Sequence, residues 1–387
     1  MLYTFNFNNS EEAVIKRETG FTLIELLITM VIFVLVIAAG SQIFTGLLTQ
    51  FKQQSKIAET NIEGIVGLEI LRQDIDHAGY GLPWTGLVTY NESGTNPYNL
   101  NDSATTSAPK AIVSANNVEL NGSDYLVVKA LNVARNNTCR KWTNLKASPF
   151  TAPFNPRDWA SASENLSPTD NVIVLLTGTT AINERRLVVS GSTFSTIFNN
   201  VTSTPWAPTD LTEARLVYGV DPDTALRMPF NRADYYISNT NVPQNCAPNT
   251  GVLEKATVNH GGGGFNTMPL LDCVADMQVI YGLDNDNDGD FEPGVAGSTD
   301  GYSADITALS AQQIREQVRQ VRVYILAHEG RYDRDYTYPN STIAIPAPPD
   351  PGAGLGSTFN LPTRIGTNWQ NYRWKVYTMV ETPNNLR

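Results

Sequence analysis

A run of alternating acidic residues is the part of the sequence that most directly indicates chemistry. Residues 284–289 read DNDNDG and fit the pattern D-x-D-x-D-G. In the first half of a calcium-binding loop, side-chain oxygens at alternate positions converge on a hard cation, and the glycine allows a sharp turn. The carboxylates of Asp284, Asp286 and Asp288 are therefore candidate calcium ligands.

This run does not continue as an EF-hand. An EF-hand places a glutamate eleven residues after the first aspartate, where this chain has Val295. Residues 277–281 are rich in Val, Ile and Tyr and read as a strand instead of a flanking helix. We expect either another kind of calcium site, in which the ion would hold the loop in one conformation, or a solvated Asn/Asp turn. In the first case, further ligands would come from Asp290, Glu292, Asp300 or Asp305. We expect no required cofactor.

The three cysteines, Cys139, Cys246 and Cys273, indicate neither a zinc site nor a thioredoxin-like site, because no two of them form a CxxC pair. In an oxidising compartment they allow one disulfide and one spare thiol, and the sequence leaves all three pairings open. Buried, unreactive thiols are the alternative.

The residue combinations of common catalytic sites are missing from the sequence. His260 precedes a glycine run, residues 261–264, that lacks the Lys-Ser/Thr of a phosphate loop. His328 and Glu329 are not followed by the second histidine of HExxH, and no GxSxG is present. The third histidine, His77, is expected to be a solvated helix residue. We predict that the chain is not an enzyme.

The charge balance also narrows the choice of partners. The 387 residues include 27 Lys and Arg against 38 Asp and Glu, for a net charge of −11 at pH 7. A nucleic-acid binder needs a basic face to neutralise phosphates, so nucleic acid is not an expected partner. Charged residues make up 17% of the chain, below the usual share of about 25%. A surface made instead of neutral polar residues fits an exported protein.

An apolar stretch near the N-terminus is long enough to cross a membrane. Residues 21–39 carry one charge, Glu25, and the next charge is Lys52. About 20 apolar residues span a bilayer as a helix. Lys16 and Arg17 precede the stretch, which predicts a cytoplasmic N-terminus and an exported C-terminal part. An acid within a membrane helix is costly, so Glu25 is a candidate functional residue in need of a partner.

Residues 20–25, GFTLIE, followed by this apolar run, resemble the prepilin cleavage and N-methylation motif of type IV pilins and type II secretion pseudopilins. The resemblance implies that an inner-membrane prepilin peptidase cuts after Gly20, that Phe21 becomes N-methylated, and that Glu25 serves filament assembly. A neighbouring subunit's Glu25 would then pair with the new ammonium of Phe21. The 20-residue leader is longer than many in the family.

Beyond the membrane stretch, the helical pattern continues. Apolar residues recur at spacings of three and four, which predicts one helix with an apolar stripe. They are Phe44, Leu47, Leu48, Phe51, Ile62, Ile65, Leu68, Leu71 and Ile75. The helix should end near Ala78, because Gly79 can cap it and Pro83 cannot continue it. We expect a leader at 1–20, a membrane or filament-core half at 21–50, an amphipathic half at 51–80, and a globular domain at 81–387 that covers the stripe of the amphipathic half.

The rest of the chain is predicted to be rich in β-structure. Residues 84–123 and 136–170 read as long surface loops. Short segments rich in Val, Ile, Leu and Tyr predict strands at 125–128, 172–176, 186–189, 215–220, 235–238, 277–281, 321–326 and 374–380. A helix is expected at about 303–319. The fold class is therefore α+β: a long N-terminal helix packed on an antiparallel sheet domain with long loops.

Four segments resemble the PilW family of minor pilins, and they are residues 68–80, 273–289, 318–326 and 372–387. The resemblance implies a pilin-like fold and a minor pilin that, with other minor pilins, primes type IV pilus assembly at or near the tip. The implied partners are the other minor pilins, the major pilin, the prepilin peptidase, the inner-membrane assembly platform and membrane lipid. The chain would be single-pass in the bacterial inner membrane with a periplasmic domain, and later lie in the pilus tip at the cell surface.

Two alternatives remain. The J subunit of type II secretion pseudopili has a similar plan, so a pseudopilus tip protein is the nearest competitor. A tip adhesin that binds a surface ligand through its long loops or its acidic loop is the second.

Overall fold

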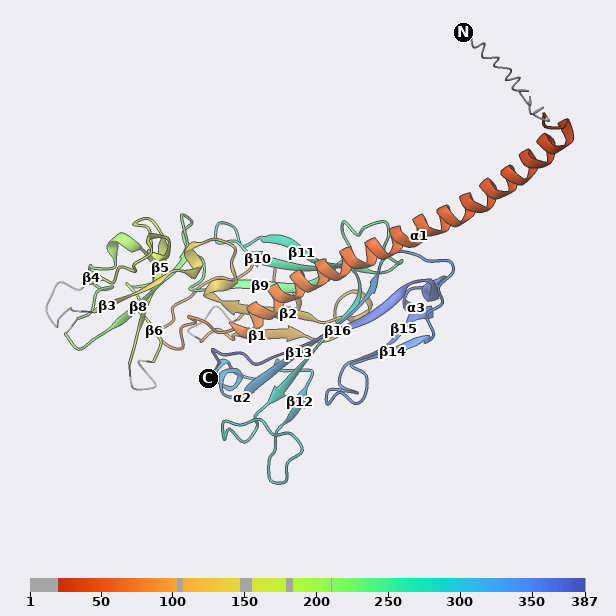
Figure 1. The fold of residues 1–387 in the computed structure, drawn as a ribbon. Coiled ribbons are helices and arrows are strands. Elements are labelled where there is room, and N and C mark those ends of the chain that lie inside the picture. Colours follow the sequence, from red (N-terminus) through yellow and green to blue (C-terminus); the bar gives the residue numbers. More distant parts are fainter. Residues whose placement is uncertain (1–19, 103–106, 147–154, 179–183, 210, 387) are drawn as a thin grey trace, which may run out of the picture. The chain divides into compact units, whose positions relative to one another are not determined.

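The computed structural model describes residues 20–102, 107–146, 155–178, 184–209 and 211–386 (Figure 1). The predicted leader up to Thr19, with Lys16 and Arg17, lies outside the described residues. The chain divides into two compact units between Gln54 and Ser55. The helix α1, Leu23–Asp76, runs through this division, and the other α-helices among the described residues are α2, Ala311–Gln317, and α3, Leu361–Arg364.

In the first unit, α1 is continuous, and its apolar side chains are exposed. It is long and apolar enough to cross a membrane, and none of its most apolar 18-residue window is buried. Phe33 is 66% exposed and Leu35 64% exposed, values far above those of residues in a folded core. An apolar helix without cover inside its own chain needs lipid or other helices around it.

The main sheet of the second unit is antiparallel and has eight strands (Figure 1). Its order is β1-β2-β9-β10-β11-β13-β16, and β12 pairs with β11. The strands are β1 (Ile112–Ala115), β2 (Tyr125–Ala130), β9 (Asn231–Ser238), β10 (Gly251–Val258), β11 (Phe265–Leu283), β12 (Gly301–Ser303), β13 (Val318–Glu329) and β16 (Arg373–Glu381).

A second antiparallel sheet of six strands has the order β4-β3-β8-β5-β6, with β7 paired to β5. Its strands are β3 (Trp142–Lys146), β4 (Asn155–Pro156), β5 (Asn171–Leu176), β6 (Arg186–Leu187), β7 (Thr196–Ile197) and β8 (Arg215–Asp221). It has its own apolar core, which includes Leu145, Val174 and Val217. The strands β14 (Thr342–Ile345) and β15 (Ser357–Asn360) form a separate hairpin.

The predicted α+β class is confirmed, and the two loop predictions are partly wrong. The buried strand β1 lies in the predicted loop 84–123, and β3 lies in the predicted loop 136–170. Both strands are only four or five residues long and contain Ser, Thr or Asn. Their local composition therefore resembles that of a loop and did not predict a strand. Pairing with β2 and β8 supplies the stabilisation that their sequences do not signal.

The helix predicted at about 303–319 is also shorter than expected. It begins only after Ser310, whose hydroxyl accepts the Gln313 backbone N–H while the Gln313 side chain accepts the Ser310 N–H. This capping box fixes the start of α2, and Val318 and Arg319 already belong to β13.

Glycines bring the amphipathic part of α1 against the main sheet. Gly64 and Gly67 are buried, and a Cβ atom at position 67 would lie 2.0 Å from the carbonyl oxygen of Leu270. Leu71 and Ile75 continue this buried face at helical spacing. The prediction that the domain covers the stripe in the second half of the helix is therefore wrong at Ile62 and Ile65, which are 64% and 68% exposed.

Candidate functional site

The residues of the predicted cleavage motif lie at the start of α1. Gly20 and Phe21 precede the helix, and Phe21 is 85% exposed. The Glu25 carboxylate accepts the Thr22 backbone N–H at 2.9 Å and the Thr22 hydroxyl at 2.7 Å. The Thr22 hydroxyl in turn accepts the Glu25 N–H at 3.4 Å.

This reciprocal arrangement is a capping box, which satisfies free N–H groups in the first turn of a helix. The pattern T-x-x-E at positions 22–25 is the signal for this capping box in the sequence, in addition to the charge of Glu25. The Glu25 carboxylate is thus hydrogen-bonded to Thr22 of its own chain, and it is exposed, so that a second group could also contact it. Cleavage after Gly20 and methylation of Phe21 remain predictions.

In the second unit, α1 leaves an apolar face exposed. Ile62, Ile65 and Val66 are 64%, 68% and 58% exposed. By helix geometry, they lie on the side opposite to Gly67 and Leu71, which face the sheet. Three large apolar side chains on one uncovered helix face are suited to contact another apolar helix.

The structure chooses among the three open cysteine pairings. Cys246 and Cys273 form a disulfide, with their Cα atoms 4.9 Å apart, which joins the segment after β9 to β11. Cys139 is a free, buried thiol, and burial raises its pKa to about 11. That thiol is therefore protonated at neutral pH and unreactive.

The histidines have structural surroundings. His328 is fully buried near the disulfide, its Nε2 accepts the Ala247 N–H at 2.8 Å, and burial lowers its pKa to about 4. Burial also lowers the pKa of His260 to about 4, and its Nδ1 accepts the Arg227 N–H at 3.3 Å. His77 is half-exposed near the end of α1, as predicted for a solvated helix residue.

The acidic loop follows β11 and leads to β12 (Figure 1). One carboxylate oxygen each of Asp284, Asp286 and Asp288 lies within 4.8 Å of the others. Asp284 is fully buried, whereas the other two are exposed. The exposed Asp290 and Glu292 are not members of this compact group.

A residue that the sequence analysis missed supports the acidic loop. Arg319 of β13 donates from Nε and Nη2 to Oδ2 of Asp284, at 3.0 and 2.7 Å. Desolvation opposes ionisation of Asp284, but these bonds and the Gly289 N–H outweigh it and hold the pKa of Asp284 below its ordinary value. Asp284 is therefore an anion at neutral pH.

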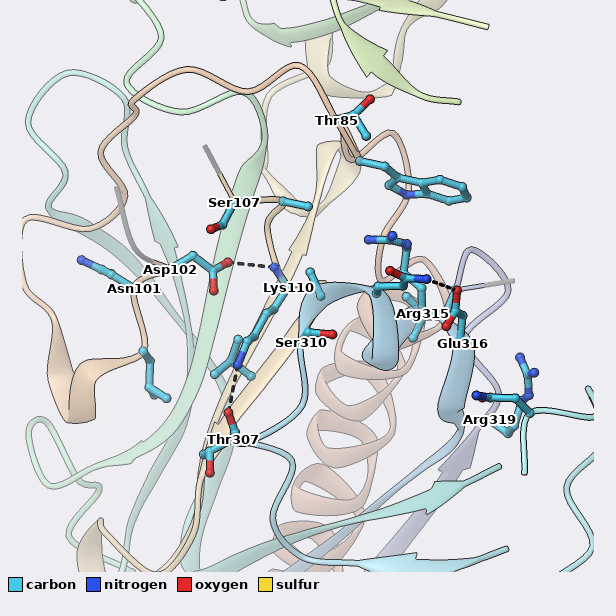
Figure 2. Close-up of a pocket in the computed structure, with 18 of the residues that line it drawn as sticks. Thr85, Asn101, Asp102, Ser107, Lys110, Thr307, Ser310, Arg315, Glu316 and Arg319 are labelled. Carbon is cyan, nitrogen blue, oxygen red and sulfur yellow. Dashed lines mark hydrogen bonds between the residues drawn. The ribbon is translucent and has the colours of Figure 1, made fainter. Parts of the chain in front are cut away.

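A cavity of about 1400 Å³ adjoins this loop (Figure 2). The Trp84 ring at its edge lies 4.7 Å from the Arg185 guanidinium and 4.5 Å from that of Arg315. Lys110 bridges two walls, because its backbone N–H donates to Asp102 and its Nζ to the Thr307 carbonyl (Figure 2). No histidine or cysteine is among its described lining residues. The cavity thus offers polar and cationic contacts without a histidine base or a thiol nucleophile.

A buried ionic network holds the segment after α1 against the main sheet. Lys129 of β2 contacts Glu92 at 2.8 Å and Asp102 at 2.7 Å. Arg232 of β9 contacts the other oxygen of Glu92 at 2.7 Å and Asp234 at 2.7 Å. The side chains of both bases are 0% exposed. In the sequence, Lys129 within the otherwise apolar strand β2 was a signal, whereas Arg232 lies in β9 among polar residues and gave none.

A buried acid beside β11 makes stability depend on pH. Asp124 accepts the N–H groups of Asn117 and Val279 at 2.8 and 2.7 Å, yet desolvation raises its pKa to about 7. The unfolded chain loses this proton near pH 4, and the folded chain keeps it until about pH 7. The free energy of unfolding should therefore fall between these values as pH rises, by at most about 4 kcal/mol.

Asp124→Asn should flatten this dependence, so that the variant gains stability relative to wild type between pH 4 and pH 8. Denaturant melts of the full chain in detergent, followed by tryptophan fluorescence, measure it. Asp305→Asn is the matched control, because the Thr307 N–H lowers the pKa of Asp305. Removing this carboxylate should therefore reduce the free energy of unfolding more at pH 8 than at pH 4. Equal slopes for wild type and Asp124→Asn would contradict the assignment.

Comparison with known families agrees with this architecture. Residues 234–384 match the family model described as type IV pilus-assembly protein W, PilW, and residues 15–41 match the prokaryotic N-terminal methylation motif. No curated protein and no solved structure matches the chain. The first match covers β10, β11 and β13 with the disulfide and the acidic loop, and the second covers the start of α1.

A bare apolar N-terminal helix followed by an antiparallel β-domain defines a pilin-like protein. The two family matches support a PilW-family type IV minor pilin, with the PilW match covering residues 234–384. The matches indicate a structural protein of the type IV pilus, anchored in a membrane by its N-terminal helix.

Proposed function

We propose that this minor pilin is cut after Gly20 by the prepilin peptidase, N-methylated on Phe21, and assembled with other minor pilins into a complex that primes the type IV pilus. The complex then lies at or near the fibre tip. Before assembly, the chain crosses the inner membrane once, with its N-terminus in the cytoplasm and its β-domain in the periplasm. The observation that carries the proposal is the methylation motif at the start of an uncovered apolar helix whose apolar stretch, residues 21–39, contains a single acid.

The physical mechanism is helix packing. In lipid, the charge of Glu25 lacks a counter-ion, and cleavage after Gly20 creates an ammonium on Phe21. Pairing Glu25 of one subunit with the ammonium of another would remove both uncompensated charges from lipid. The exposed face with Ile62, Ile65 and Val66 would then pack against neighbouring pilin helices.

The partners that we propose are other minor pilins, the major pilin, the prepilin peptidase and the inner-membrane assembly platform. The match to a pilus-assembly family favours the pilus over a type II secretion pseudopilus. An adhesive role at the tip stays a prediction and is compatible with priming.

Mass spectrometry of the N-terminal peptide tests the proposal, applied separately to the membrane fraction and to sheared surface fibres. We expect N-methylated Phe21 as the first residue in both fractions. An intact leader that starts at Met1 and occurs only in the membrane would mean a signal-anchored protein and would overturn the proposal.

A further inference from the structure

The carboxylate of Asp284 is satisfied on one side only. Its Oδ2 accepts three hydrogen bonds, two from the Arg319 guanidinium and one from the Gly289 N–H at 3.1 Å. The Asn287 N–H also lies near this carboxyl and helps to lower its pKa, but the buried Oδ1 has no hydrogen-bond partner of good geometry among the described residues. A buried, ionised oxygen without water or a hydrogen-bond partner destabilises the folded state, so a positively charged ligand bound at Oδ1 would be stabilising.

Two more carboxylates lie where such a ligand would sit. Oxygens of Asp284, Asp286 and Asp288 lie within 4.8 Å of one another, a spacing that lets one ion contact all three. Residues 284–300 contain six acids and no Lys or Arg. Arg319 neutralises one carboxylate through Oδ2, and the mutual repulsion of the others persists.

Backbone contacts hold the loop around this group. Asp300 accepts the N–H groups of Asn285 and Glu292, each at 2.9 Å, and ties the two ends of the loop together. Asp286 accepts the Thr299 N–H at 3.3 Å. The three carboxylates are thus held near one another before any ion binds, which lowers the entropic cost of binding.

We propose that the acidic loop is a calcium site in which Oδ1 of Asp284 and the carboxylates of Asp286 and Asp288 bind the ion. Backbone oxygens and water complete the 6–8 oxygen ligands that calcium takes. An all-oxygen, flexible, exposed loop suits calcium better than magnesium, which demands a strict octahedron, or zinc, which prefers nitrogen and sulfur. A plain solvated turn would leave Oδ1 of Asp284 unsatisfied.

Calcium would fix the loop to the main sheet, because Asp284 joins the ion to Arg319 of β13. It would also order one wall of the cavity in Figure 2, which Asn287 and Gly289 of the loop help to line. The proposal does not depend on the pilus-priming function.

Isothermal titration of calcium into the full chain in detergent, with metal-free buffer, tests the site. We expect one ion per chain with a dissociation constant of about 10⁻⁴ to 10⁻³ M, as in extracellular calcium modules, and weaker binding of magnesium. The double variant Asp286→Asn, Asp288→Asn should bind calcium at least about tenfold more weakly, since it loses two of three charged ligands. Saturating calcium should raise the melting temperature of wild type by about 2–5 °C and leave this variant unchanged.

The matched control is Asp290→Asn, Glu292→Gln, which removes the same charge from the same loop outside the compact group. It should retain the affinity of wild type within about threefold and the same thermal shift. Absence of saturable binding to wild type would overturn the proposal. Equal losses in the two double variants would also overturn it, because the effect would then be diffuse attraction to an acidic loop. Unchanged far-ultraviolet circular dichroism confirms that each variant is folded.

Discussion

Cells whose only copy of this chain carries Glu25→Ala are expected to assemble few or no pili, while the variant protein is still processed and retained in the membrane. The substitution leaves the apolar helix and residues 20–22 intact, so insertion and cleavage should proceed. It removes the counter-ion proposed for the ammonium of Phe21, which then stays unpaired in lipid. Counting pili by electron microscopy, with an immunoblot of the membrane fraction, measures both effects.

Two controls separate this role from helix capping. Glu25→Gln keeps an acceptor for the Thr22 N–H and hydroxyl but loses the charge, and should therefore fail like Glu25→Ala. Thr22→Val removes the hydroxyl and keeps the charge, and should restore pili. Normal piliation with Glu25→Gln would show that Glu25 serves only as a cap and would refute the pairing.

The largest loss of stability is expected for Arg232→Met. This change leaves Glu92 and Asp234 buried without the base that bonds both, and breaking a buried ion pair on one side costs about 3–5 kcal/mol. The free energy of unfolding should fall by that amount in denaturant melts of the full chain. Lys129→Met should lower the free energy of unfolding by a similar amount, because it leaves Asp102 and the other oxygen of Glu92 without their basic partner.

The shared partner predicts how the two changes combine. Both bases bond Glu92, so the double variant should lose less stability than the two single losses added together. Arg72→Met is the surface control, because it breaks an ion pair with Glu381 on a half-exposed side chain and should change the melting midpoint little. Additive losses would mean that the two bases are energetically separate.

Local patterns in the sequence were sufficient for the elements that carry strong signals. The α1 helix ends at Asp76, just before Gly79, whose positive φ of 85° suits the turn predicted there. The strands at 172–176 and 321–326 are confirmed in β5 and β13. Strand β10, Gly251–Val258, was missed because Glu254, Lys255 and Thr257 interrupt its apolar pattern. Its eight residues are nevertheless buried between β9 and β11.

The stripe on α1 shows the limit of periodicity. Apolar spacing alone predicted that Ile62 and Ile65 face the domain, but the sheet packs against Gly64 and Gly67. A helix can approach a strand closely only where side chains are missing, and the carbonyl of Leu270 occupies that space. Which face of the helix is covered thus depends on the shape of a surface formed by residues some 200 positions away.

Local features of the chain were enough to predict the kind of protein, because short-range physical chemistry sets GFTLIE with its apolar run, the long helix and the β-rich remainder. Three contacts became visible only in the folded chain: Cys246 pairs with Cys273, Lys129 and Arg232 share Glu92, and Arg319 bonds one oxygen of Asp284. The physical reason is that each of these contacts joins residues far apart in the chain. Their distances depend on strand order and register, which no local pattern encodes.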